Sequence, residues 1–257
     1  MHTLDMRVCS VNLFDRVTLL SRDEAAEREN RGECVVLGGG RFAFASALAD
    51  FRPRLMLPRL ENAYNAIKEY FGDIDGVFLV EKSIPPCAGM GGSSAAVAAV
   101  VRLLEKKTGK TPDAGFLLSL GSDVPYMYTG GEARVTGCGE SVEKLPFVLR
   151  HVVVVYVNGG VDTATAYGLY DSGAQCAGDN HLFAAACALN GGVPVAARAL
   201  ADAGAERIVM SGSGSAVCAF FDGEDEAARV LSSLPSEFNA EILRTIDCFP
   251  YSVRSDL

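Results

Sequence analysis

A glycine-rich segment that leads into the strongest predicted helix is the part of the sequence best suited to hold an anion. Residues 84–96 read IPPCAGMGGSSAA, and the glycines permit positive φ and let backbone N–H groups converge. At a helix start, such N–H groups and the helix dipole favour a phosphate. The segment therefore predicts a polyphosphate loop, and on these residues alone a flexible connection with ordinary serine caps is an equal alternative.

Two further segments could complete such a site. Residues 120–126 (LGSDVPY) place Asp123 between a glycine and a proline, and a single carboxylate aimed at a hydroxyl group could orient or deprotonate it. The same carboxylate could instead close a turn on its own backbone before Pro125. Residues 210–215 (MSGSGS) form a second glycine-rich turn, which could bind phosphate through N–H and hydroxyl groups or could simply shape a tight hairpin.

The elements that must position these segments follow from the hydrophobic pattern. Helix 93–107 continues directly from the glycine loop, and strands 207–210 and 216–221 flank the second turn. Residues 21–31 are charged and have no apolar stripe, which favours a solvated loop over a helix. Further strands are predicted at 7–14, 32–37, 77–80, 151–157 and 240–248, and further helices at 60–71, 181–189, 193–203 and 224–234. Because strands and helices do not alternate strictly, the pattern predicts an α+β fold in two lobes.

In order and spacing, the segments resemble the three motifs of the GHMP small-molecule kinases: an N-terminal strand, a P-x-x-x-G-L-G-S-S-A-A phosphate loop and a C-terminal glycine turn. Residues 89–96 match the loop, and 61–63 (ENA) are similar to the family's D-N-L element. Residues 121–125, 130–140 and 210–219 follow its G-A-D-V-P, G-G-x-A…G-x-G-E and S-G-S-G-S-C-V-F-A elements. Within the superfamily, the match is closest to the kinases that act on 4-diphosphocytidyl-2-C-methyl-D-erythritol.

The resemblance implies a two-lobed GHMP kinase fold with ATP between the lobes. Residues 1–146 would form a lobe like ribosomal protein S5 domain 2, and residues 147–257 a ferredoxin-like lobe. It also implies a phosphotransferase that moves the γ-phosphate of ATP to an alcohol in isoprenoid precursor synthesis. Phosphoryl transfer asks little covalent chemistry of a protein, because positioning and charge neutralisation lower most of the barrier.

The resemblance further assigns roles to individual residues. Asp123 would face the acceptor hydroxyl, Asn62 would lie beside adenine, and Mg²⁺ would lie beside Ser94. The phosphates of ATP would rest on the loop residues Gly89, Met90, Gly91, Gly92, Ser93 and Ser94. The residues implied on the acceptor side are Asn12, Thr163, Gly212 and Ser213, of which Thr163 could equally be a helix N-cap.

The chain departs from the family's first motif, P-A-K-I-N-L. Residues 8–13 read VCSVNL, so Ser10 stands at the catalytic position where the family has a lysine that is thought to assist the aspartate. A hydroxyl group supplies no positive charge, and removing one such electrostatic contact can cost about 10²-fold in rate. Lys82 or Arg16 could supply that charge from elsewhere in the fold.

A second departure concerns the acceptor. Where the related kinases have D-G-Y-H, whose aromatic residues hold cytosine, residues 19–27 read LLSRDEAAE. The cytidyl group is then held by other residues, or the acceptor is a polyol, a sugar or homoserine. A non-catalytic nucleotide-binding regulator and an α+β scaffold without a nucleotide are the alternatives from other classes.

Composition limits the remaining possibilities. Hydrophobic residues make up 49% of the 257 and charged residues 21%, as in a folded globular protein, and a net charge of −9 argues against a nucleic-acid partner. The longest apolar runs fall well short of a bilayer span, and the first residues lack a secretory signal pattern, so a soluble cytoplasmic protein is expected. A monomer or a homodimer is expected, without a membrane partner. Eight cysteines without paired spacing predict reduced, mostly buried thiols.

Overall fold

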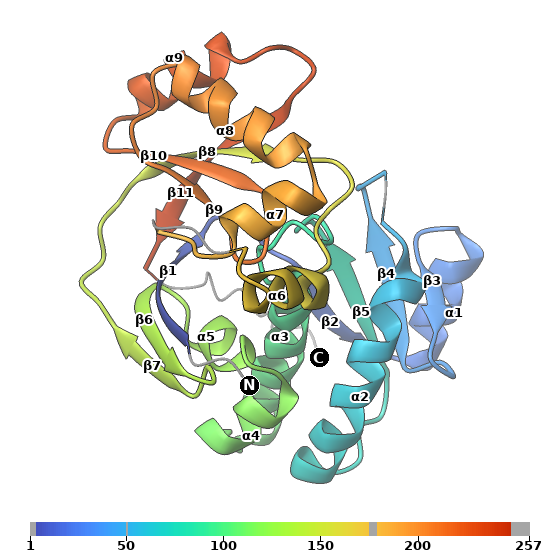
Figure 1. Ribbon diagram of the computed structural model, residues 1–257. Helices are drawn as coiled ribbons and strands as arrows, with labels where there is room; N and C mark the ends of the chain where they lie inside the picture. Colours follow the sequence, from blue (N-terminus) through green and yellow to red (C-terminus); the bar gives the residue numbers. More distant parts are fainter. Residues whose placement is uncertain (1–3, 50, 175–178, 248–257) are drawn as a thin grey trace.

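The computed structural model describes residues 4–49, 51–174 and 179–247 (Figure 1). Its strands are β1 (Leu4–Val11), β2 (Arg16–Leu20), β3 (Val35–Leu37), β4 (Phe42–Ser46), β5 (Val77–Lys82), β6 (Glu132–Gly137), β7 (Ser141–Lys144), β8 (His151–Tyr156), β9 (Ile208–Met210), β10 (Val217–Phe221) and β11 (Asn239–Ile246). Its helices are α1 (Arg22–Asn30), α2 (Pro53–Phe71), α3 (Gly92–Thr108), α4 (Ala114–Leu120), α5 (Val124–Thr129), α6 (Thr163–Asp171), α7 (Phe183–Leu189), α8 (Gly192–Asp202) and α9 (Glu224–Ser233).

A seven-stranded antiparallel sheet joins the two halves of the chain. Its strand order is β7-β6-β1-β11-β8-β10-β9, with β1 pairing with both β6 and β11. In the register of the second pair, Ser10 lies opposite Ile246 and Val11 opposite Thr245. One sheet therefore carries strands from both predicted lobes, and the boundary between residues 146 and 147 stays a prediction.

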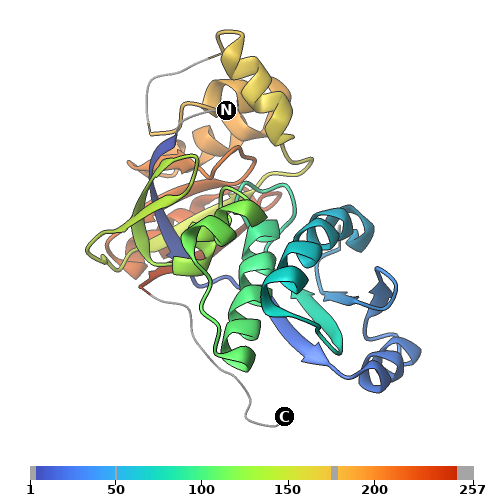
Figure 2. The ribbon, with the colours of Figure 1, turned by 90° about the horizontal axis from the view of Figure 1, so that it is seen from below.

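A second, four-stranded sheet of order β2-β5-β4-β3 lies to the right in Figure 1, and β4 and β5 are its parallel pair. Helices α2 and α3 run alongside one another near this sheet (Figure 2). They bury Leu60, Val97 and Val101 against Phe42 and Phe78. This core fixes α3, and therefore the loop that precedes it, against the sheet.

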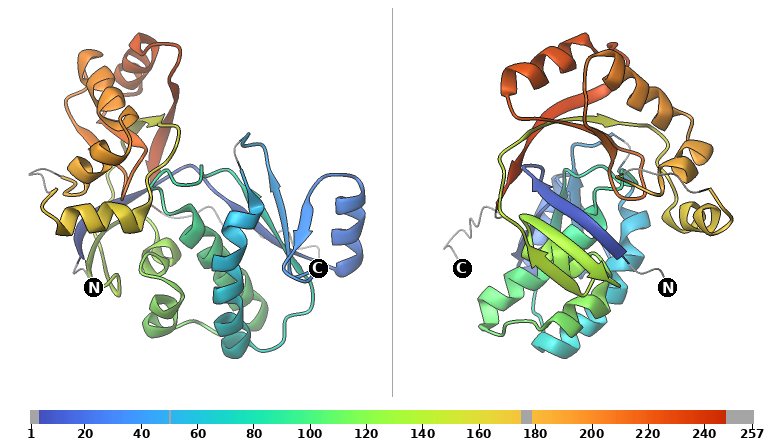
Figure 3. Two further views of the ribbon diagram at one scale, coloured as in Figure 1. Left: turned by 45° about the vertical axis from the view of Figure 1, so that its right-hand side comes forward. Right: turned by 60° about the vertical axis from the view of Figure 1, so that its left-hand side comes forward.

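Helices α8 and α9 pack against strands of the C-terminal half, and α6 packs against α7 (Figure 3). The valines of β8 alternate between two clusters, because successive side chains of a strand point to opposite faces. Val153 and Val155 pack with α7 and α8, whereas Val152 and Val154 pack with Ala88 of the glycine loop on the other face. The continuous apolar run of β8 is thus explained by burial on both faces.

Residues 21–31 contradict the prediction of a loop, because they form α1. Ser21 caps the helix: its hydroxyl accepts the Glu24 N–H at 3.2 Å, while the Glu24 carboxylate accepts the Ser21 N–H at 2.9 Å. Asp23 and Glu24 in the first turn suit the helix dipole, and only Ala25 is buried. Capping and helix-dipole interactions at its N-terminus therefore stabilise α1, although it has no apolar stripe.

The cysteines are less buried than predicted. Only two of the six described cysteines are buried, so the prediction of mostly buried thiols is wrong for the described set. Cys34 and Cys218 are buried, Cys9, Cys138 and Cys187 are intermediate, and Cys87 is exposed. Cys176 and Cys248 lie outside the described residues.

Within the described chain, no single helix has the length and apolar character of a membrane span. Helices α7 and α8, which meet at a bend of 118°, have them only when taken together.

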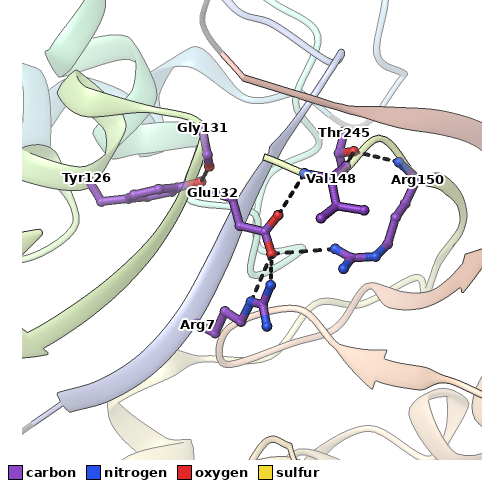
Figure 4. Close-up of polar contacts among 7 residues, drawn as sticks. All are labelled: Arg7, Tyr126, Gly131, Glu132, Val148, Arg150 and Thr245. Carbon is purple, nitrogen blue, oxygen red and sulfur yellow. Dashed lines mark hydrogen bonds and ion pairs between the residues drawn. The ribbon is translucent and has the colours of Figure 1, made fainter. Parts of the chain in front are cut away.

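The buried carboxylate of Glu132, on β6, holds the segment that connects β7 to β8. The Glu132 side chain is 2% exposed, accepts from Arg7 Nε at 2.8 Å, and lies 3.5 Å from Arg150 Nη1 (Figure 4). It also accepts the Val148 N–H at 3.3 Å, and Thr245 accepts the Arg150 N–H at 2.8 Å. Burial acts to raise the pKa of Glu132, but the two guanidinium groups outweigh it and hold that pKa below its ordinary value.

We expect Glu132→Gln to lower the free energy of unfolding at pH 7 by about 1–3 kcal/mol, because it leaves two guanidinium groups without their carboxylate. Arg7 is half exposed, so water screens its charge and limits the loss. The pKa of Glu132 is lower in the folded protein than in the unfolded chain, where it is near 4.5. The stabilisation by the carboxylate is therefore complete above the unfolded-state pKa and is lost as the pH falls through the folded-state pKa. Urea unfolding from pH 7 to pH 3 should show the difference shrinking on acidification. The exposed Glu143→Gln is the control, and equal effects of the two substitutions would contradict the expectation.

Candidate active site

The predicted phosphate loop and the predicted glycine turn are in direct contact. Ala216 donates its N–H to the Ala88 carbonyl at 3.0 Å, and Ser215 donates its N–H to the Cys87 carbonyl at 3.2 Å. The Ser211 hydroxyl donates to the Gly89 carbonyl at 3.1 Å. Segments more than 120 residues apart are thereby joined at the backbone.

Gly89 is required at this junction for two reasons. Its φ is +73°, a backbone conformation that residues with a side chain rarely adopt. A Cβ at this position would overlap the Ser211 carbonyl and lie 2.7 Å from the Gly214 nitrogen. The Met90 side chain packs with Ala88 and Val152 in the core below. The backbone of the loop thus runs between the packed C-terminal turn and the start of α3.

The start of α3 presents the predicted phosphate-binding groups. Gly91 is at the N-cap position with φ +67°, and Gly92, Ser93 and Ser94 form the first turn, whose N–H groups have no partner within the helix. Ser93 is exposed and Ser94 is buried. The predicted loop therefore leads directly into a helix N-terminus, as an anion site requires.

Two of the predicted acceptor-side residues meet on the C-terminal side of the loop. The hydroxyl oxygens of Thr163 and Ser213 are 2.8 Å apart. Asn180, which sequence reasoning did not single out, donates from its amide to the carbonyl oxygens of Met210 at 2.8 Å and Gly212 at 2.7 Å. The N-cap of α6 is Asp162, so the alternative role of Thr163 as an N-cap is wrong.

Asp123 immediately precedes α5 and is exposed. Its side chain caps no backbone N–H of that helix, and Ser122 Oγ lies 3.4 Å from Asp123 Oδ1. Burial raises the pKa of Tyr167 on α6, and the charge of nearby Asp123 raises it further. Asp123 from the N-terminal half and Tyr167 from the C-terminal half therefore lie within electrostatic reach of one another.

Ser10 is buried behind the Asp123 segment. Its hydroxyl accepts the Gly131 N–H at 3.1 Å and lies 3.0 Å from the Tyr126 hydroxyl. That phenol donates to the Gly131 carbonyl at 3.0 Å (Figure 4), so Ser10 is the donor between the two hydroxyls. Burial raises the pKa of Tyr126, which keeps the phenol protonated. Ser10 thus supports the segment that carries Asp123 and brings no charge to it.

Lys82 is already engaged. Its ammonium group pairs with buried Asp15 and donates to the Gly92 carbonyl at 3.3 Å, while Asp15 accepts the N–H groups of Ser83 at 2.9 Å and Ile84 at 3.0 Å. Burial lowers the pKa of Lys82, although Asp15 opposes the shift. Arg16 is exposed and lies 3.9 Å from Glu81. Lys82 and Asp15 together anchor the strand end that leads into the loop.

The two predicted asparagines lie elsewhere. Asn12 accepts the Arg244 N–H through its side-chain oxygen at 2.7 Å, so it fastens the end of β1 to β11. Asn62 is exposed on α2, three residues after Arg59 and on the same face of the helix. The structure therefore shows a structural contact for Asn12 and a position on the α2 surface for Asn62.

Arg59 is a residue that sequence reasoning missed. Its Nη2 donates to Ser94 Oγ at 2.8 Å. An ideal Cβ built on Gly121, two residues before Asp123, would lie 2.8 Å from the same nitrogen. The one available signal was its place one turn before Asn62, but the predicted helix of residues 60–71 left Arg59 out, whereas α2 begins at Pro53.

The described residues form no Mg²⁺ site from protein ligands alone. Within residues 4–49, 51–174 and 179–247, no group of three His, Cys, Asp or Glu side chains could hold a metal ion. Ser94, the predicted metal ligand, already accepts a hydrogen bond from the Arg59 guanidinium. A cationic neighbour disfavours a divalent ion at that oxygen, and the assignment of Ser94 stays a prediction.

Comparison with known proteins gives matches along most of the chain. Residues 59–131 match the family model "GHMP kinases N terminal domain", and residues 170–240 match "GHMP kinases C terminal". The 4-diphosphocytidyl-2-C-methyl-D-erythritol kinase of Bifidobacterium longum (strain DJO10A) is 30% identical over 247 residues, covering 90% of this chain and 76% of the relative. The Clostridium botulinum (strain Eklund 17B / Type B) kinase of that name is 38% identical over 118 residues, 42% of each chain.

Solved structures share the fold. A 4-(cytidine 5'-diphospho)-2C-methyl-D-erythritol kinase superposes with a TM-score of 0.69 at 24% identity, covering 95% of this chain and 90% of the other. L. major mevalonate kinase, solved with R-mevalonate, gives 0.63 at 12% identity over 95% and 90% of the two chains. Homoserine kinase from Cytophaga hutchinsonii ATCC 33406 gives 0.61 at 18% identity over 83% and 82%. The predicted two-lobed α+β architecture is confirmed.

We expect Gly89→Ala to separate the loop from the turn. The added Cβ overlaps the Ser211 carbonyl at a backbone conformation that alanine rarely adopts, so the free energy of unfolding should fall by about 2–4 kcal/mol. Gly191→Ala is the control, because its φ is −62° and no atom lies near the new methyl group. Chemical unfolding of both variants tests this, and a Gly89→Ala protein as stable as Gly191→Ala would contradict the packing described.

Proposed function

The chain belongs to the GHMP kinase family, and on that premise we propose that it transfers the γ-phosphate of ATP to a hydroxyl group of a small-molecule acceptor. One observation carries this proposal: the glycine loop, held from below by the Ser211–Ala216 turn, places the N-terminus of α3 beside the segment that bears Asp123. A phosphate site and a carboxylate thus share one region of the molecule.

The backbone binds the triphosphate in this proposal. The N–H groups of Gly92, Ser93 and Ser94 at the first turn of α3 donate to phosphate oxygens, and the positive end of the helix dipole adds to the attraction. The chain as a whole carries a net charge of −9, so the anion is held by local groups. Mg²⁺ would accompany the nucleotide on its phosphates, since no cluster of three His, Cys, Asp or Glu side chains among the described residues could hold it by itself.

Asp123 receives the proton in the transfer step. The acceptor oxygen bonds to the γ-phosphorus as the bond from that phosphorus to the β,γ-bridging oxygen breaks, and ADP leaves with the electron pair. The hydroxyl proton passes to the Asp123 carboxylate, which is exposed and is not used in capping α5. Thr163 and Ser213, whose hydroxyls meet across the C-terminal side, would orient the acceptor.

The acceptor that we propose is 4-diphosphocytidyl-2-C-methyl-D-erythritol. Relatives with that activity in their names are 30% identical along 90% of this chain, which supports the class and leaves the compound to experiment. Tyr167 is partly exposed and lies within electrostatic reach of Asp123, so we propose its aromatic ring as a contact for the cytosine ring. Other alcohols, including homoserine, are the alternative acceptors.

A second candidate function, a nucleotide-binding regulator without turnover, is favoured by one observation. Ser10 is sequestered with Tyr126 and Gly131 and brings no charge to Asp123. The two functions share nucleotide binding and differ in acceptor-dependent release of ADP.

We expect acceptor-dependent ADP release from MgATP with 4-diphosphocytidyl-2-C-methyl-D-erythritol, and Asp123→Asn should lower kcat by at least about 10²-fold because asparagine cannot take the proton. Asp113→Asn is the matched control, since Asp113 caps α4 on the surface and asparagine caps equally well. A coupled ADP assay over a panel of alcohols is the measurement.

The outcomes separate the candidates. Turnover on a different alcohol retains the kinase and replaces the acceptor, and nucleotide binding without turnover on any alcohol supports the regulator. A MgATP concentration about 100-fold above Kd should stabilise a binding protein by roughly 2.7 kcal/mol. Absence of any thermal shift under those conditions would overturn both candidates.

A further inference from the structure

The Arg59 guanidinium bridges the two segments that the proposed reaction uses. It donates from Nη2 to Ser94 Oγ at 2.8 Å, in the first turn of α3, and the same nitrogen lies against Gly121, where an ideal Cβ would be 2.8 Å away. Gly121 begins the three-residue segment, residues 121–123, that joins α4 to α5 and carries Asp123. One cationic group therefore lies beside both the phosphate-binding helix and the carboxylate segment.

A positive charge at this point has a chemical purpose. During phosphoryl transfer, negative charge is spread over the oxygens of the moving group, and a prearranged cation stabilises it. Ser10 has no charge, and the Lys82 ammonium is buried and shared between Asp15 and the Gly92 carbonyl. Neither residue therefore offers a free positive charge to neutralise the phosphoryl group during transfer.

Arg59 has donors to spare. A guanidinium carries five N–H groups, and the described part of the chain engages one of them, on Ser94. The residue as a whole is exposed, so the other donors are accessible to a ligand. The planar fork of an arginine matches the paired oxygens of a phosphate better than an ammonium does.

We propose that Arg59 contacts the γ-phosphate of the bound nucleotide and neutralises the charge that develops on it during transfer to the acceptor. This inference rests on the proposed kinase function and deepens it. It follows that Arg59 distinguishes nucleotides that have a γ-phosphate from those that lack one. Ser94 orients the guanidinium for this contact.

The test compares Arg59→Ala, Arg59→Gln and Arg59→Lys with the wild-type protein. Arg59→Ala should lower kcat by at least about 10²-fold, and it should weaken binding of the β,γ-imido analogue of ATP by roughly tenfold while ADP affinity stays within about threefold. Arg59→Gln keeps a donor for Ser94 without the charge and should behave like Arg59→Ala. Arg59→Lys keeps the charge without the fork and should lie between them and the wild type.

Arg54→Ala is the matched control, because Arg54 is an exposed arginine of the same helix, five residues earlier and on a different face. It should leave kcat and both affinities unchanged. If Arg59→Ala does not fold, the comparison of Arg59→Gln with Arg59→Lys decides the matter. The proposal is overturned if Arg59→Gln matches the wild type, or if the substitutions weaken ADP and the imido analogue equally, as a purely structural tie to Ser94 would.

Failure of this inference is distinct from failure of the proposed function. If the wild-type protein binds both nucleotides but phosphorylates no alcohol, the proposed reaction fails, and discrimination between the two nucleotides still decides the role of Arg59. If the wild-type protein binds neither nucleotide in calorimetry, both proposals are wrong.

Discussion

The backbone hydrogen bonds between the glycine loop and the C-terminal glycine turn are the contacts on which the rest of the site depends. Residues 87–89 accept from residues 211, 215 and 216, so the path of the loop into α3 is set by a strand pair from the opposite half of the chain. The contact works only because Gly89 has no side chain. A local glycine motif is thus given one conformation by tertiary structure.

Buried charges hold the same region from two other sides. Asp15 and Lys82 lock the end of β5, and Glu132 ties β6 to the arginines of β1 and of the segment that leads into β8. Such pairs contribute little net stability compared with apolar replacements, but breaking one is costly because a charge is then left buried. Their value here is that they define where the loop starts and where the two halves join.

Much of the fold was predictable because its strongest elements are long and apolar. The small and aliphatic residues of 92–108, the continuous apolar run of β8 and the glycine turn at 211–215 are clear local signals. The helix α1 was missed because capping and dipole interactions form it, without an apolar stripe. Arg59 and Asp15 were missed because their significance lies in partners 35 and 67 residues away, which no local pattern reveals.

The pairing of β1 with β11 bears on how the chain acquires its structure. These neighbours at the middle of the large sheet are separated by more than 230 residues, as the contact between Asn12 and Arg244 illustrates. Loop closure over such a span is slow, and on the ribosome the edge of β1 must wait for β11 to be synthesised. During that interval one edge of β1 has unpaired N–H and C=O groups, and such an edge can pair with another chain.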